Sequence, residues 1–174
     1  MASSYAVRST PAETFNKITV SCWFKGHADG TQRNFWGLYD NSSSNRFFAL
    51  YFSTNGSLYG YWKQNEGTFF TLGTVSGTQY YFPGGMSHCH MCVGYAYDAS
   101  SFGSTDSTTG EWKINTAPSV SYGTNGGFWF KDGSQLTDSS TNSNTLTASG
   151  TLTNTEDCPS DNFCTFNALL PQSN

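Results

Sequence analysis

The chain has 174 residues, enough for one domain of ordinary size, and a formal net charge of −4. Nucleic-acid binding requires clustered basic side chains, and the eight Lys and Arg residues are scattered along the chain, so we expect no nucleic-acid partner. No apolar stretch is long enough to span a bilayer and the first ten residues do not resemble a signal peptide, so we expect no membrane partner either.

Aromatic residues make up 17% of the chain, and only 11% of the residues are charged. Disordered chains are poor in aromatic residues, whereas strands favour aromatic and β-branched residues. The remainder is rich in Gly, Ser, Thr and Asn, which are typical of turns. The composition therefore predicts an all-β protein, and we expect an antiparallel β-sandwich made of short strands.

Alternation along the chain supports this class. In KITVSCWFKG (17–26) one face is formed by apolar residues, as in a half-buried strand: Ile18, Val20, Cys22 and Phe24. RFFALYFS (46–53) is apolar on both faces, and Asn55-Gly56 predicts a hairpin turn before an alternating strand over 58–63. Further strands are expected within 67–73, 77–85 and 88–98, and no window has a helical period.

The segment HCHMC (88–92) contains two His and two Cys, all of which are zinc ligands. On a strand, His88, His90 and Cys92 face one way while Cys89 and Met91 face the other, so they cannot all reach one tetrahedral ion. We therefore expect no metal and interpret His90 as a core or cross-strand residue.

The chain has five cysteines, so at least one stays unpaired. Cys89 and Cys92 are about 10 Å apart along a strand, which is beyond disulfide reach. Cys158 and Cys164 flank a loop that can close. We expect free thiols at most positions.

No enzymatic motif is present in the sequence. The four Glu residues do not form the paired pattern of a jelly-roll glycosidase, and there is no Gly-x-Ser-x-Gly, phosphate loop or His-Glu-x-x-His. We expect no catalytic residues, no cofactor and no enzymatic activity.

Three stretches carry a resemblance to a known family. SSYAVRSTPAETFNKITVSCWFKG (3–26) resembles the opening of the laminin-G-like, concanavalin A-like jelly rolls of bacteriophage structural proteins. Its Tyr-x-x-Arg-Thr-Pro-like stretch and its Thr-x-Ser-x-Trp-x-Lys strand fall on Tyr5, Arg8, Thr10 and Pro11, and then on Thr19, Ser21, Trp23 and Lys25. A second block of the same proteins matches 98–103, 105–113 and 122–126, and the segment CPSDNFCTFNALLP (158–171) resembles the one that follows. The middle, between Gly67 and Gly85, is shorter than in that family, and longer relatives continue beyond the position of Asn174.

The resemblance implies three segments. Residues 1–98 are expected to form the laminin-G-like sandwich, and residues 99–133 a strap that packs back on it. We expect Phe102 and Trp112 to be the two buried anchors of this strap.

Residues 134–174 are interpreted as either a flexible Ser/Thr-rich linker or an extended arm that lays strands on a neighbouring subunit. In the arm interpretation, Phe163, Phe166 and Leu169 contact that neighbour.

The resemblance implies a virion structural protein, of the capsid decoration, head-fibre or tail-fibre type, that is made in the bacterial cytoplasm and assembles with other copies and other virion proteins. The alternative is a carbohydrate-binding module that recognises host surface glycans. A sugar site needs exposed aromatic rings and polar side chains, and the candidates are Trp36, Tyr39, Asp40, Tyr59, Tyr61 and Trp62. A calcium ion at the Asp40-Asn41 loop lacks the run of acidic ligands that would support it.

Overall fold

The computed structural model describes residues 4–11, 15–26, 30–39, 46–62, 69–74, 80–131 and 136–155. These residues form eleven β-strands and a single 3-10 turn, η1 (Ala99–Ser101), and they contain no α-helix. All the strand pairings are antiparallel. The prediction of an all-β protein with antiparallel sheets is therefore confirmed.

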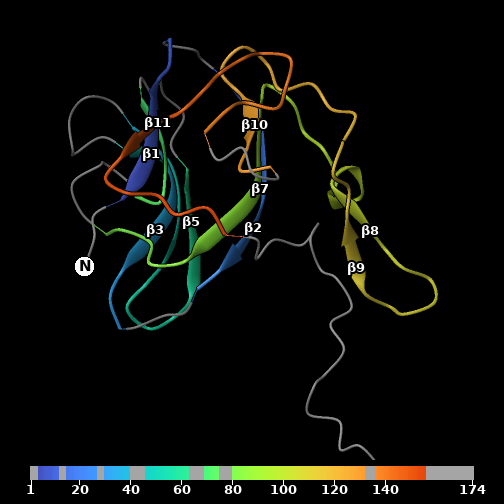
Figure 1. Cartoon of the computed structure of the whole chain (residues 1–174), viewed down its shortest axis with the longest axis horizontal. Helices are drawn as coiled ribbons and strands as arrows, with labels where there is room; N and C mark the ends of the chain where they lie inside the picture. The colour runs from blue at the N-terminus through green and yellow to red at the C-terminus, as the bar shows by residue number, and fades with distance from the viewer. Residues whose placement is uncertain are drawn as a thin grey trace, which may run out of the picture.

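The strands form two larger sheets and one hairpin (Figure 1). The six-stranded sheet has the order β11-β1-β6-β3-β4-β5 and contains β1 (Tyr5–Ser9), β3 (Arg33–Tyr39), β4 (Arg46–Phe52), β5 (Leu58–Trp62), β6 (Phe69–Leu72) and β11 (Thr147–Ser149). The three-stranded sheet has the order β10-β7-β2 and contains β2 (Ile18–Lys25), β7 (Gly85–Val93) and β10 (Gly127–Trp129). The hairpin pairs β8 (Gly103–Thr105) with β9 (Trp112–Ile114).

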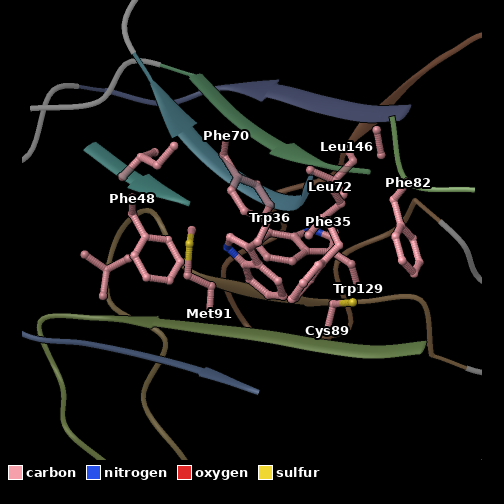
Figure 2. Close-up of a cluster of buried hydrophobic side chains, with 13 residues drawn as sticks. Phe35, Trp36, Phe48, Phe70, Leu72, Phe82, Cys89, Met91, Trp129 and Leu146 are labelled. Carbon is pink, nitrogen blue, oxygen red and sulfur yellow. The ribbon is translucent and has the colours of Figure 1, made fainter. Parts of the chain in front are cut away.

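One hydrophobic core lies between the two larger sheets. Trp36 and Phe70 from the six-stranded sheet pack in one cluster with Met91 and Trp129 from the three-stranded sheet. Figure 2 shows these side chains filling the space between β7 and the strands opposite. Trp36 and Trp129 have no exposed surface, and the ring centroids of Phe70 and Trp129 are 4.8 Å apart. Aromatic residues thus supply the burial that holds the two layers together.

The hairpin turn predicted at Asn55-Gly56 is confirmed. β4 and β5 pair from Phe52 opposite Leu58 to Phe48 opposite Trp62. Gly56 has a φ of +81°, which glycine adopts without a steric penalty. The Ser53 amide donates to the Ser57 carbonyl at 2.9 Å, which closes the turn.

The strand expected within 77–85 is not found in the part of this range that the structure describes. Residues 80–84 have no strand assignment, and Tyr80 has a φ of +58°, which interrupts an extended conformation. These residues still lie beside strands, because the Asn34 amide donates to the Tyr80 carbonyl and the Phe82 amide donates to the Gly73 carbonyl. Phe82 is buried in the core between the sheets.

The segment after β7 covers the outer face of the three-stranded sheet. A second hydrophobic cluster there contains Cys92, Phe102, Tyr122 and Phe128. Phe102 is buried, as expected of a strap anchor. The second anchor is Tyr122, whose hydroxyl group lies 3.0 Å from Nδ1 of His90 on β7. The segment therefore packs back on the sheet, but through a residue that the sequence analysis did not select.

Trp112 is not a buried anchor, and that expectation is wrong. Its side chain is 43% exposed, and it lies in the β8–β9 hairpin, which is drawn in yellow beside the two sheets in Figure 1. The indole packs on Gly103, where an added Cβ would lie 2.6 Å from Nε1 of Trp112. Asp106 closes the hairpin, because its carboxylate accepts hydrogen bonds from the Thr108 and Thr109 amides and from Lys113 Nζ. Trp112 thus stabilises its own hairpin.

The two larger sheets continue beyond residue 98, where we expected the sandwich to end. β10 pairs with β7, and β11 pairs with β1 at the edge of the six-stranded sheet. Trp129 and Leu146, which lie beyond that boundary, belong to the core between the sheets. Part of the expected arm is therefore a strand of the chain's own sheet.

Polar side chains hold the segment before β11 in place. Asp138 is buried, and its carboxylate accepts hydrogen bonds from the backbone amides of Phe128, Ser140 and Asn144 at 2.7–2.9 Å. The Asn144 side chain donates to the carbonyls of Thr124 and Gly126, both at 2.8 Å. Within 136–149, these side-chain hydrogen bonds act together with the burial of Leu146 in the core, so this part is not a free linker.

Candidate functional site

The candidate interaction surface is strand β5, at one edge of the six-stranded sheet. In the described residues β5 pairs only with β4, so one side of its backbone has no strand partner. The side chains of Leu58, Tyr59 and Tyr61 are 56%, 45% and 43% exposed. An edge strand with exposed apolar side chains is a template for pairing with another chain.

The two tyrosines of β5 share the outer face of the sheet. Tyr59 lies opposite Tyr51 and Tyr61 lies opposite Ala49, whereas Leu58 lies opposite Phe52, which packs on the core. Because side chains alternate along a strand, Tyr59 and Tyr61 point away from the core. The rings of Tyr51 and Tyr59 are stacked, with centroids 5.6 Å apart and an angle of 15° between their planes. The outer face of this edge therefore carries a stacked pair of tyrosines beside the exposed Tyr61.

Two other residues proposed for glycan binding are placed differently. Trp36 has no exposed surface and packs on Phe70 in the core, with centroids 5.5 Å apart, so its assignment to a glycan site is wrong. Tyr39 is half-buried and stacks on Phe69 at 5.6 Å. Burial, and to a smaller extent the nearby Tyr5, raise the pKa of Tyr39 above its usual value. The prediction for Trp36 failed because a tryptophan in the core and a tryptophan that binds a sugar cannot be distinguished in a sequence.

Several predicted site residues lie outside the described part of the chain. Asp40, which was considered both for glycan binding and for a calcium ion, is one of them. The proposed subunit contacts are the others: Phe163, Phe166 and Leu169. Trp62 is the last residue of β5, and the structure describes its backbone but not its side chain. These expectations remain predictions.

The HCHMC segment forms part of β7 and alternates as predicted. Cys89 and Met91 belong to the core between the sheets, whereas Cys92 belongs to the cluster under the strap. His90 stacks on Phe128, with ring centroids 3.9 Å apart. Burial, with smaller contributions from His88 and Lys131, lowers the pKa of His90 to about 3. A neutral, stacked imidazole is a packing residue, as the sequence analysis expected.

No cluster of three or more His, Cys, Asp or Glu side chains that could hold a metal ion occurs among the described residues. Cys22, Cys89 and Cys92 are free thiols, and burial raises the pKa of Cys92 to about 12. Within the same residues, no helix has the length and apolar character needed to cross a membrane.

The first two of the three stretches that carry the family resemblance lie in contact with each other. Arg8 Nη1 donates to the Asn125 carbonyl at 3.3 Å, and Asn125 Nδ2 donates to the Pro11 carbonyl at 2.9 Å. Thr19 is similarly tied to the end of β7, since its hydroxyl donates to the Tyr95 carbonyl at 3.0 Å. These hydrogen bonds connect the start of the chain to the segment that follows β7, so these motif residues contribute to the fold.

The close approach of the YGTNG turn (122–126) to β7 explains why Gly126 must be a glycine. A Cβ at Gly126 would lie 2.0 Å from the Tyr122 carbonyl oxygen and 2.1 Å from that of Met91. Such distances are far inside van der Waals contact, so only glycine permits this turn to lie against β7.

Comparison with known proteins does not assign this chain to a family: no protein-family model, curated protein or solved structure matches it.

Proposed function

We propose that this chain is a structural subunit of a bacteriophage virion, of the capsid decoration, head-fibre or tail-fibre type, and that it is built on a laminin-G-like jelly roll. The sequence resemblance supports the virion assignment. The fold assignment is supported by two antiparallel sheets that share one core and by a strand order that places β1 beside β6 and β11. Such pairing of strands far apart in the chain is a property of double-sheet folds with Greek-key connections.

The observation that carries the assembly part of this proposal is the edge strand β5. Pairing with a strand of a second copy would satisfy the backbone groups on its open side and bury Leu58 and Tyr61. A self-assembling subunit benefits from such an edge, whereas proteins that act as monomers usually block their edges with charges or prolines.

The experiment compares the mass of the native particle in solution for three proteins. The wild type is expected to form a discrete oligomer in sedimentation velocity and native mass spectrometry. The double variant Leu58→Lys/Tyr61→Lys should sediment as a monomer, because charges on an edge strand oppose pairing. Tyr95→Lys is the matched control, because Tyr95 is also 43% exposed but lies outside the sheets.

The proposal that β5 drives assembly is wrong if the double variant, shown by circular dichroism to be folded, keeps the wild-type mass. A wild type that is monomeric at micromolar concentration would also contradict it.

The second candidate function, glycan binding, is favoured by one observation, the exposure of Tyr59 and Tyr61 on one face of the edge strand β5. Pyranose rings stack on such exposed aromatic faces. A glycan array with the wild type and Tyr59→Ala tests it. Binding that disappears in Tyr59→Ala while the oligomer persists would favour this function over assembly through β5.

A further inference from the structure

Two thiols lie on neighbouring strands, Cys22 on β2 and Cys89 on β7. β2 lies at the edge of the three-stranded sheet and pairs only with β7 among the described strands. Ser21 lies opposite His90 and Trp23 lies opposite Ser87, so Cys22 alone faces the two residues His88 and Cys89. This is a β-bulge in β7, and His88 there has a φ of +49°.

The bulge places Cys22 opposite Cys89, with both side chains on the inner face of the sheet. Cys89 belongs to the core between the sheets, and Cys22 packs against that core. Cys22 is also one of the groups that raise the pKa of the Cys89 thiol, so the two side chains are neighbours. Opposed residues of antiparallel strands have Cα atoms about 4.5–5.5 Å apart, which falls within the range that a disulfide spans.

We propose that Cys22 and Cys89 form a cross-strand thiol pair that a dissolved disulfide oxidises to a covalent clamp between β2 and β7. Cys92, three residues further along β7, points into the cluster under the strap and has no such neighbour. The pair was not foreseen from the sequence, because the two cysteines are far apart in the chain and only the bulge aligns them.

The two thiols have different roles in the reaction. Cys22 is partly exposed, whereas Cys89 is fully buried. Burial raises the pKa of the Cys89 thiol well above its usual value, and the neighbouring Cys22 raises it further. The Cys22 thiolate therefore attacks first. Only the thiolate is the nucleophile, and the more buried group is the less reactive one.

The step balances with oxidised glutathione as the oxidant. The Cys22 thiolate attacks one glutathione sulfur, forms a mixed disulfide and expels one glutathione thiolate. The Cys89 thiol loses its proton to water and attacks the Cys22 sulfur, which expels the second glutathione thiolate. Two protein thiols are oxidised to one disulfide, and one glutathione disulfide is reduced to two thiols.

The experiment uses the full chain, incubated with oxidised glutathione, blocked with iodoacetamide and digested with trypsin without reduction. Cleavage after Lys17, Lys25, Lys63 and Lys113 places Cys22 alone in peptide 18–25 and both Cys89 and Cys92 in peptide 64–113. We expect these two peptides to be recovered as one linked species. Fragmentation should assign the link to Cys89.

Two variants separate this pair from the other cysteines. The linked species should persist in Cys92→Ala and disappear in Cys22→Ser. A link to Cys92 in the wild type, or recovery of peptide 18–25 only in its unlinked form, would overturn the proposal. These two outcomes need only the wild type, so they do not depend on whether a core variant folds.

A second measurement, the thermal unfolding midpoint, tests whether the disulfide stabilises the protein. The oxidised wild type should unfold at a temperature roughly 10 °C higher than the same protein kept in dithiothreitol, because the disulfide closes a long loop. Cys22→Ser should show the same midpoint under both conditions. Equal midpoints for the oxidised and reduced wild type would mean that the thiols do not pair.

Discussion

The two faces of strand β7 are both buried, but different parts of the molecule cover them. The inner face carries Cys89 and Met91 into an apolar core against the opposite sheet. The outer face carries His90 and Cys92 under the strap, where rings of Phe102, Tyr122 and Phe128 surround the imidazole. The side chains of the inner face are stabilised by close packing of apolar surface alone. The buried imidazole on the outer face also needs hydrogen-bond partners.

This difference explains why the strap has the composition it does. A polar, turn-rich segment buries little apolar surface, so a few aromatic residues must hold it against the sheet. Tyr122 combines a ring with a hydroxyl group that reaches His90, which satisfies one polar atom of the buried imidazole. The inner and outer faces thus depend on different residues, and variants can separate them.

The largest effect is expected for removal of the strap's buried ring. Phe102→Ala should lower the free energy of unfolding by about 3–5 kcal/mol, as for other buried phenylalanines. Denaturation in urea, followed by circular dichroism, measures this change. Tyr95→Ala is the control, because its side chain is exposed and we expect a change within about 0.5 kcal/mol. If Phe102→Ala changes stability as little as the control does, the strap does not hold the outer face.

The next effect is a pH dependence from His90. Its pKa is about 3 in the folded protein against an ordinary value of 6.5, so below pH 6.5 the unfolded chain binds a proton that the folded protein does not. The stability contributed by the neutral imidazole is complete above pH 6.5 and is lost as the pH falls toward 3. At pH 5 we expect a loss of about 2 kcal/mol.

The measurement is urea denaturation at pH 7 and pH 5 for the wild type and His90→Gln. The carboxylates contribute to both proteins alike, so the difference between the two pH dependences isolates the imidazole. Parallel pH profiles would show that His90 is protonated as readily in the folded protein as in the unfolded chain.

The smallest effect is expected at Trp112. Because its indole is 43% exposed and packs on Gly103 within one hairpin, Trp112→Ala should cost about 1 kcal/mol or less. The same denaturation experiment measures it beside Phe102→Ala. If Trp112→Ala lowers the free energy of unfolding as much as Phe102→Ala does, the hairpin belongs to the hydrophobic cluster between the strap and β7.

Particular residues show how far the sequence predicts this fold. The aromatic-rich, low-charge composition predicts strands, and Asn55-Gly56 predicts the β4–β5 turn, because both signals depend on local backbone preferences. The alternation of His90 with Cys89 and Met91 follows from the geometry of any strand. These predictions need no knowledge of which segments meet.

Tertiary structure alone decides what covers each face. Trp36 and Trp112 are the same residue type in strand-forming segments, yet one is buried in the core and the other is exposed on a hairpin. The strand β11 lies in a segment whose polar composition predicts a linker or an arm, and it pairs with β1 because the Asp138 network holds the preceding residues in place. The strand class and the alternation can be predicted from the amino-acid sequence, because they depend on neighbours along the chain. The anchors, the β5 edge and the Cys22–Cys89 pair depend on residues brought together from distant positions, which only the folded chain defines.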